Sequence, residues 1–289
     1  MDILFSLDTF IPDLSDDERF SILRSVATKY GLPEIGVSDE ALDELIITVQ
    51  QNHRSVEYHN FSHCISVVRA GCILSERCGL ISKLGKVEKL ALFVGTLCHD
   101  IDHRGFSNDE LEKKNHPLGI LYNGLSVMEM HHCAFTISMF EKSPKISSIL
   151  GLLSQEEVNS FWRLVIDLIK ATDLKKGNEI MDNIKSVIAK GINYDDSSDV
   201  KAVLELIIKS SDLYATCSPS SISQKWSTLV YQERFQKLPE SEEKMAGGEI
   251  WFLTNMSLPL FNLLYSFDSC FDIERKQVMS NIEFWKSKK

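Results

Sequence analysis

The sequence predicts an all-α protein, folded as a compact multi-helix bundle. Apolar residues recur at the three- and four-residue spacing of helices along most of the chain, and two runs open with capping boxes, Ser15–Glu18 and Ser154–Glu157. The sequence has no convincing alternating run of the kind that indicates a strand. Its single Asn-Gly pair, Asn123-Gly124, lies between two helical runs, where it predicts a helix stop rather than a hairpin.

The helices are expected in the following order along the chain. The Ser15 box opens the first, a Ser38-Asp-Glu signal opens the second, and the Ser154 box opens a later one. Further helical runs are expected at residues 62–78, 86–99, 117–122, 126–141, 178–190, 199–213, 219–235, 250–267 and 272–286. The turns expected at residues 31–36, 195–199, 218–223 and 239–248 are too short for interdomain linkers. We therefore expect a single domain over residues 1–289, with a core of about residues 16–285.

Composition excludes several classes of protein. The chain has 289 residues, of which 44% are hydrophobic and 25% charged, so it is not intrinsically disordered. It has 31 Lys and Arg residues and 41 Asp and Glu residues, which gives a net charge of −10. This acidic balance argues against a nucleic acid polymer as partner, because such binding depends on Lys and Arg meeting many phosphates. On charge alone, a phosphate-bearing substrate is disfavoured as well.

The cysteines and the most apolar window bear on location. Seven cysteines form no C-x-x-C pair and no even framework, which indicates reduced thiols and a cytoplasmic protein. The N-terminus has no basic stretch ahead of its apolar residues, so we expect no signal peptide. The window 250–267 contains Thr254, Asn255 and Pro259, so it predicts a buried helix and no membrane span.

Two histidine-rich segments carry the candidate chemistry. His59 and His63 are four residues apart, which predicts one face of a helix, although a surface or helix-cap pair has the same spacing. His99, Asp100 and His103 follow an apolar run at residues 90–97, and their spacing predicts one helical face as well. A buried helix that ends in these groups would bury unpaired charge unless a metal compensates, so the second segment predicts a metal site.

The types of donor indicate the kind of metal and reaction. Mixed imidazole and carboxylate ligands suit zinc, manganese, iron or magnesium, and they disfavour a closed structural zinc site, which usually uses Cys. An Asp next to a His, as at His99-Asp100, can bridge two metals that share a hydroxide and clamp a phosphoryl group. A histidine left free, such as His59, can then protonate the leaving oxygen.

These segments resemble the catalytic domain of the class I cyclic nucleotide phosphodiesterases. The resemblance covers roughly residues 16–285 and keeps the family's order of motifs. Its motifs are Tyr58–His63, His99–Gly105, His116–Leu118, Met128–His132, Ala171–Leu174 and Ser211–Leu213. Two segments, Asp-His-Arg-Gly and Asn-His-Pro-Leu, resemble most closely the sequences of the branch with GAF regulatory domains. This branch includes cGMP-hydrolysing members. No GAF domain is present in this chain.

The resemblance implies a metal-dependent hydrolysis of a 3′,5′-cyclic nucleotide to the nucleoside 5′-monophosphate. It implies two divalent metals, Zn²⁺ at the tight site and Mg²⁺ or Mn²⁺ at the second, which share the attacking hydroxide. Matched residue by residue, the tight-site ligands are His63, His99, Asp100 and Asp212, with Asp100 as the bridge. The polar shell of the second metal matches His103, Glu129 and Thr172, and the general acid that protonates O3′ matches His59.

The base pocket departs from the family pattern Gln-x-Gly-Phe, for which the best match is Glu249-Ile-Trp-Phe252. Phe252 keeps the stacking role, Val230 is expected as the opposite jaw, and Tyr58 is a further substrate-binding candidate. A carboxylate only accepts hydrogen bonds, and guanine offers two adjacent donors where adenine offers an acceptor, so Glu249 favours cGMP over cAMP. Burial against Trp251 and Phe252 would raise the pKa of Glu249 and weaken this preference. The alternative is that Glu249 is a solvated carboxylate at a helix N-terminus.

Two other functions stay open. Trp251 and a short loop between Asp212 and Glu249 are compatible with an HD-type phosphohydrolase acting on another nucleotide or a cyclic dinucleotide. An altered base pocket is also compatible with a nucleotide-binding pseudoenzyme. The expected partner is a small cyclic nucleotide, and the sequence leaves open a homodimer or a regulatory domain fused in a longer parent.

Overall fold

The computed structural model describes residues 9–289, and all regular elements in this range are helical. The α-helices are α1 (Asp16–Lys29), α2 (Leu32–Ile35), α3 (Asp39–Asn52), α4 (Phe61–Arg77), α5 (Lys86–Cys98), α6 (Asn108–Lys113), α7 (Pro117–Leu121), α8 (Val127–Lys142), α9 (Pro144–Ser147), α10 (Gln155–Ala171), α11 (Gly177–Lys190), α12 (Ser197–Asp212), α13 (Ser220–Phe235), α14 (Glu242–Phe252), α15 (Leu258–Phe267) and α16 (Asp272–Lys286). Short 3₁₀ segments are η2 (Ile11–Asp13), η3 (Leu80–Lys83), η4 (Leu150–Leu152), η5 (Leu174–Lys176), η6 (Tyr214–Cys217) and η8 (Ser269–Phe271), and η7 (Leu253–Ser257) is a π-helical turn. The all-α prediction is confirmed.

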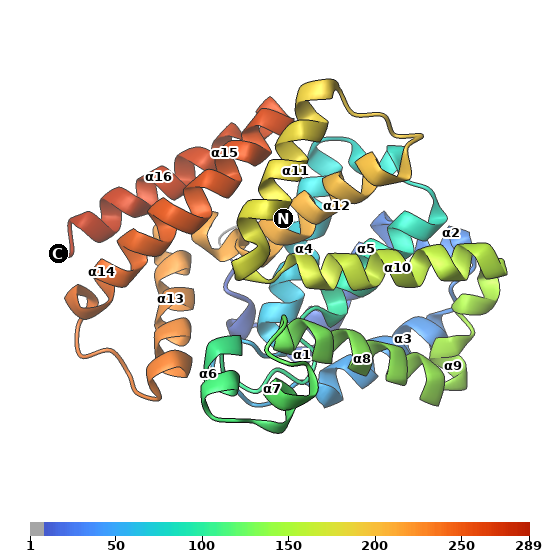
Figure 1. The fold of residues 1–289 in the computed structure, drawn as a ribbon, viewed down its shortest axis with the longest axis horizontal. Helices are drawn as coiled ribbons and strands as arrows, with labels where there is room; N and C mark the ends of the chain where they lie inside the picture. Colours follow the sequence, from blue (N-terminus) through green and yellow to red (C-terminus); the bar gives the residue numbers. More distant parts are fainter. Residues whose placement is uncertain (1–8) are drawn as a thin grey trace.

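Helix α4 is the centre of the bundle. Every residue from Phe61 to Ser75 is buried, which is possible because α1, α5 and α12 all pack against this helix (Figure 1). Helix α10 covers the other side of α5, where Gly95 lets the two helices approach closely against Leu168. A helix that is covered on all sides cannot tilt without disturbing its neighbours, so α4 provides a rigid support for whatever its first turn carries.

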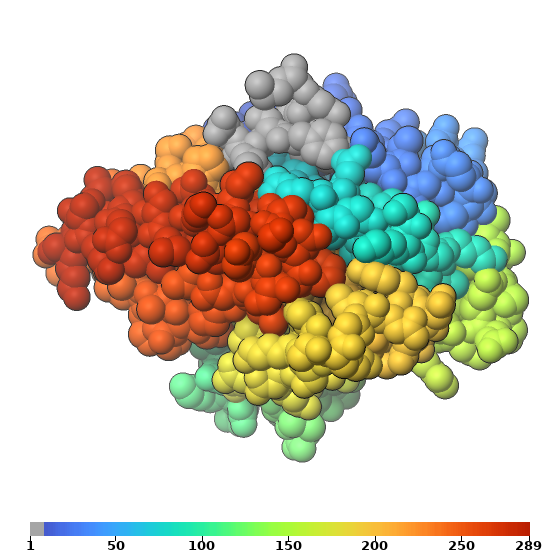
Figure 2. Space-filling view, turned by 90° about the horizontal axis from the view of Figure 1, so that it is seen from above, coloured from blue at the N-terminus to red at the C-terminus, as the bar shows by residue number. Residues whose placement is uncertain are grey.

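The C-terminal helices form a second group at one end of the molecule. Helices α14, α15 and α16 pack on one another through the π turn η7, and they occupy the end opposite to the N-terminal helices (Figures 1 and 2). One hydrophobic core nevertheless extends from Ile11 to Trp285. Helices α6 and α7 pack against the first turn of α8 in a small separate apolar cluster around Leu111, Val127 and Met128.

Most predicted helices lie within a few residues of their expected bounds, but the region after α13 differs. We expected a turn at residues 239–248 and one helix at 250–267. Helix α14 instead begins at Glu242 and passes through Gly247 and Gly248, because Met245 and Ala246 are buried in the core and their packing outweighs the low helix propensity of glycine. The run is then interrupted at η7, directly before Pro259, which cannot donate to a carbonyl one turn earlier.

Three further helices, α2, α6 and the single turn α9, were not predicted. Ser107 and Glu110 form a complete capping box that opens α6, a signal that the sequence contains but that precedes only one buried apolar residue, Leu111. Residues 31–36, expected as a turn, contain the single helical turn α2 between Gly31 and Gly36, both of which have positive φ. Among residues 9–289, no helix is both long enough and apolar enough to cross a membrane.

The buried core predicts a large loss of stability on truncation of Phe93 in α5, which is fully buried. We expect Phe93→Ala to lower the free energy of unfolding by about 3–5 kcal/mol in urea titrations, because a cavity remains between packed helices. The matched control is Phe235→Ala at the exposed end of α13, for which we expect a change within about 0.5 kcal/mol. Equal losses for the two variants would contradict this assignment of the core.

Candidate metal centre

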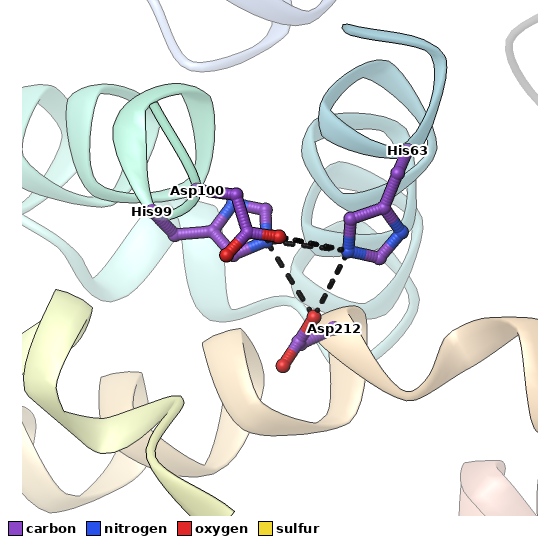
Figure 3. A group of neighbouring side chains, drawn as sticks. All are labelled: His63, His99, Asp100 and Asp212. Atoms are coloured by element: carbon purple, nitrogen blue, oxygen red, sulfur yellow. Dashed lines mark hydrogen bonds and ion pairs between the residues drawn. The ribbon is translucent and has the colours of Figure 1, made fainter. Parts of the chain in front are cut away.

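Three helix ends meet at one point beside α4. His63 lies in the first turn of α4, His99 caps the C-terminus of α5 with Asp100 directly after it, and Asp212 is the last residue of α12 (Figure 3). Because α4 packs on both α5 and α12, these side chains point toward one another. The C-terminal ends of α5 and α12 carry partial negative charge, which favours a cation at this point.

The four side chains form a compact set of potential ligands, with one ligand atom of each within 4.8 Å of the others. His63 Nε2 lies 3.1 Å from Asp212 Oδ1 and 3.4 Å from Asp100 Oδ2. His99 Nε2 lies 3.2 Å from Asp100 Oδ2 and 3.4 Å from His63 Nε2. Two imidazoles and two carboxylates are a donor set that divalent metals such as zinc accept.

Two details show that this set fits a cation. His99 Nδ1 donates to the carbonyl of Thr96 at 2.9 Å, which leaves the lone pair of Nε2 for a ligand. Asp100 Oδ2 is buried and has no hydrogen-bond partner among the described residues, a costly state for a carboxylate oxygen unless a cation compensates. The segment His99-Asp100, from which a metal site was predicted, therefore offers a free imidazole nitrogen and an unpaired carboxylate oxygen as ligands.

Electrostatics at the cluster favour bound positive charge. Burial lowers the pKa of His99, but the carboxylates of Asp100 and Asp212 outweigh burial and hold this pKa well above its ordinary value. Burial likewise raises the pKa of Asp100, and the opposing contacts with His99 and His63 bring it well below its usual range. The same negative potential that retains a proton on His99 attracts a divalent cation in its place.

The structure corrects the helical geometry predicted for both histidine segments. His59 does not lie on α4, because Asn60 caps that helix through a hydrogen bond from Ser62 N–H and the preceding residues are irregular. Helix α5 ends at Cys98, so His99, Asp100 and His103 lie on a turn and do not share a helical face. His63, His99 and Asp100 are nevertheless close together. The ends of α4 and α5 and the turn after α5 bring them there, not a shared helical face.

His59 stands beside the metal cluster with a carboxylate partner. Its ring centroid lies 5.7 Å from that of His63, and its Nδ1 donates in a short hydrogen bond to Glu233 Oε1 on α13. Glu233 Oε2 accepts from the backbone N–H groups of Tyr58 at 2.8 Å and His59 at 3.0 Å. Burial lowers the pKa of His59, but the bond with Glu233 and the nearby carboxylates outweigh burial, so the pKa is raised.

Asp100 also belongs to a second group of potential ligands, with His103 and His132. His103 Nδ1 accepts from the N–H of Gly105 at 3.0 Å, so a neutral His103 carries its proton on Nε2 and acts as a donor. His132 Nδ1 donates to the carbonyl of Ile101 at 2.5 Å, which leaves an acceptor at Nε2, 3.7 Å from Asp100 Oδ1. Asp100 thus faces one group on each side, as expected of a bridging carboxylate.

The other two residues expected around a second metal lie in polar surroundings. Glu129, on α8, accepts from Asn108 Nδ2 at 2.9 Å, and burial together with Asp173 raises its pKa to about 7. Thr172 is buried at the end of α10 and donates to the carbonyl of Ile169 at 2.7 Å. The described residues contain one more group of potential ligands, His59, His103 and Glu233. Glu129 belongs to none of the three groups.

Aromatic rings hold the cluster from the side of α13. The ring of Tyr58 packs on the His63 imidazole with centroids 4.5 Å apart, and Trp226 meets Tyr58 edge-on at 5.7 Å. Both Tyr58 and Trp226 are buried. Tyr58 was expected as a substrate-binding residue, and its ring here supports His63.

The candidate base-pocket residues lie on α13 and α14. Ser227 Oγ donates to Glu249 Oε2 at 2.8 Å and joins the two helices, one turn from Val230, which is 38% exposed. Glu249 is half-buried near the end of α14, so the alternative of a solvated carboxylate at a helix N-terminus is wrong. Burial raises the pKa of Glu249, as expected, although the hydrogen bond from Ser227 opposes the shift. Trp251, one of the two residues expected to bury it, is 60% exposed. Phe252 is half-buried on the same helix.

Two residues of the site were missed by sequence reasoning. His132 is in the motif Met128–His132, where its histidine pair was a visible signal without an assigned role. Glu233 had no signal, because a single acidic residue near the end of a helix is ordinary. Only the packing of α13 against the segment before α4 brings it to His59.

Comparisons with known proteins agree with this geometry. A family profile described as 3′5′-cyclic nucleotide phosphodiesterase matches residues 58–273. A high affinity cGMP-specific 3′,5′-cyclic phosphodiesterase 9A from Drosophila melanogaster is 26% identical over 86% of this chain and 17% of its own length. A probable 3′,5′-cyclic-AMP phosphodiesterase from Caenorhabditis elegans is 28% identical over 74% of this chain and 32% of its own length. The chain therefore spans a third or less of these two relatives.

The fold is also found in a solved structure. The phosphodiesterase domain of a rhodopsin fusion protein from Salpingoeca rosetta superposes with a TM-score of 0.90, over 99% of this chain and 95% of that chain, at 22% identity. That likeness concerns the fold of the whole helical bundle.

The ligand geometry predicts which substitutions remove tightly bound metal. After dialysis, we expect His63→Ala and Asp212→Ala each to retain only a small part of the divalent metal that the wild type retains. The metal content is measured by inductively coupled plasma mass spectrometry. His116→Ala is the control, because His116 caps α7 through Leu118 N–H and belongs to none of the ligand groups. Metal retained in both cluster variants, or lost equally in the control, would contradict the assignment.

Proposed function

Because the chain belongs to the 3′5′-cyclic nucleotide phosphodiesterase family, we propose that it hydrolyses a 3′,5′-cyclic nucleotide to the nucleoside 5′-monophosphate. The observation that carries this proposal is the pairing of the His63, His99, Asp100 and Asp212 cluster with His59, a proton donor held by Glu233. We take residues 1–289 as one catalytic domain, and the seven unpaired cysteines support a cytoplasmic location. A homodimer, a fused regulatory domain and kinship to the GAF branch stay predictions.

The cluster would hold two cations. We propose that His63, His99, Asp100 and Asp212 bind Zn²⁺, and that Asp100 shares a second cation, Mg²⁺ or Mn²⁺, with the polar shell of His103, Glu129 and Thr172. The two imidazoles of the first donor set support zinc at the first position, and the shell of mostly oxygen donors supports a harder ion at the second. When bound, such a pair supplies polarisation of the phosphoryl oxygens and activation of water.

The proton on the leaving group comes from the protein. The oxygen of water bonds to phosphorus and the water releases one proton to solvent as the bond to O3′ breaks. His59 Nε2 gives its proton to O3′ and then regains one from solvent. Glu233 orients the imidazole through Nδ1 and stabilises its protonated form. The hydrogen bond to Glu233 supports this role for His59, because a general acid needs both a proton and a fixed direction.

The base pocket supports a preference for cGMP. Ser227 donates to Glu249 Oε2, which stabilises the carboxylate and leaves Oε1 to accept from guanine. The relatives include enzymes named for cGMP and for cyclic AMP, so the preference rests on Glu249 rather than on similarity. Val230 and Phe252 are the proposed jaws that hold the base, and Tyr58 contributes through His63.

The first test is hydrolysis of cGMP and cAMP side by side with Mg²⁺ or Mn²⁺ supplied. We expect turnover of both substrates and a higher kcat/KM for cGMP, with nucleoside 5′-monophosphate as product. Turnover of neither substrate would refute the proposed function and favour another phosphohydrolase or a pseudoenzyme. Equal or better turnover of cAMP would refute the guanine preference alone.

Replacing the acid in the base pocket tests the origin of the preference. We expect Glu249→Gln to reduce the ratio of kcat/KM for cGMP over cAMP by about tenfold or more, since a charged hydrogen bond is replaced by a neutral one. Trp251→Ala, two residues away and exposed, should leave the ratio unchanged. Because the pKa of Glu249 is raised, the preference of the wild type should also grow as pH rises and the carboxylate forms.

The pH profile tests the link between His59 and Glu233. The protonated form of His59 is the active one, and Glu233 helps to raise its pKa, so activity should fall as pH rises through that pKa. We expect Glu233→Gln to lower kcat by about tenfold to a hundredfold at neutral pH and to move the alkaline limb of kcat/KM to lower pH. An unshifted alkaline limb would show that Glu233 does not tune the general acid.

A further inference from the structure

The turn between α5 and α6 carries two residues of the site with Asp102 between them. Asp100 lies on one side and His103 on the other. Asp102 has a φ of 58°, in the left-handed region that residues other than glycine, asparagine and aspartate rarely adopt. A backbone of this kind persists only where its surroundings hold it in place, so the contacts of Asp102 decide the shape of the turn.

The Asp102 carboxylate is buried and accepts three hydrogen bonds. Oδ1 accepts from Arg54 Nε at 2.7 Å, and Oδ2 accepts from Arg104 Nη2 at 2.9 Å and from His131 Nε2 at 2.8 Å. The two bonds from arginine are charge-assisted, and such bonds are among the stronger polar contacts in proteins. None of these three hydrogen bonds joins Asp102 to the four-residue metal cluster or to His59.

The three donors come from different parts of the chain. Arg54 lies in the connection between α3 and α4, five residues before His59. Arg104 belongs to the turn itself. His131 lies on α8, two residues after Glu129 and next to His132. Asp102 therefore ties the segment of the proton donor and the helix of the second-metal shell to the turn that presents Asp100.

The positions of Asp100 and His103 depend on the hydrogen bonds that hold Asp102. The ring of His103 stacks on that of His59 with centroids 4.0 Å apart. His132 donates to the carbonyl of Ile101, and its free nitrogen faces Asp100 Oδ1. If the turn relaxed, Asp100 would move relative to His132 and Glu129, whereas His63 and Asp212 are held by α4 and α12 and would stay in place.

We propose that Asp102 is a positioning residue for the reaction, which fixes the turn so that Asp100 and His103 face the second cation. This inference rests on the proposed function, but it concerns a residue that contacts neither substrate nor metal. The tight position keeps His63, His99 and Asp212 besides Asp100, so the proposal predicts that binding at the second position suffers far more than binding of the tightly held metal.

The test is Asp102→Asn, because asparagine tolerates the left-handed backbone but has only one acceptor oxygen and no charge. We expect the dissociation constant for added Mn²⁺, measured by electron paramagnetic resonance titration, to rise at least tenfold. We expect kcat for cGMP to fall at least tenfold, KM to change less than threefold, and the tightly bound metal to stay at its wild-type content. Arg54→Gln and His131→Gln should change Mn²⁺ affinity in the same direction by smaller factors.

The matched control is Asp43→Asn, which removes the charge from another tie between two elements, the pair of Arg24 on α1 and Asp43 on α3. It should leave Mn²⁺ affinity and kcat unchanged. Wild-type Mn²⁺ affinity in Asp102→Asn, or loss of the tight metal in the same proportion, would overturn the inference. If the wild type hydrolyses no cyclic nucleotide, the proposed function fails, and the Mn²⁺ titration still decides the role of Asp102.

Discussion

Negative charge buried where three helix ends meet is the constraint on which the rest of this structure depends. Asp100 and Asp212 lie beside the C-terminal ends of α5 and α12, whose own dipoles add to the negative potential. Such an arrangement is costly unless a cation occupies it, because buried carboxylates without partners destabilise a fold. The packing of α4 against both helices brings the charges together, and the same packing makes the centre rigid.

Helix α13 connects the metal cluster, His59 and the candidate base-pocket residue Glu249. Trp226 supports the aromatic stack on His63, Ser227 holds Glu249, and Glu233 holds His59. These residues lie within two turns of a single helix, so the proposed base-binding residue and the proposed proton donor share one support. The acidic net charge is compatible with this chemistry, because a single cyclic phosphate needs only a local cation site and not a basic surface.

Local sequence signals predicted the helices and the metal-binding segment well, because capping boxes and apolar periodicity act within one or two turns. They predicted the geometry of His59 and His99 less well, since both lie just outside helices whose ends depend on Asn60 and on the turn at Asp102. Asp212 was assigned only through resemblance to a family, and Glu233 was not assigned. Both residues reach the site through contacts between helices far apart in sequence, which a local pattern does not encode.

We propose above all that a metal cluster and a separate proton donor act together on the phosphodiester. The most direct test is His59→Ala, assayed for cGMP turnover and for metal content in the same preparation. The account predicts that kcat falls by about a hundredfold to ten-thousandfold while the tightly bound metal stays at its wild-type content. Turnover near the wild-type rate, or loss of the metal together with activity, would contradict the claim.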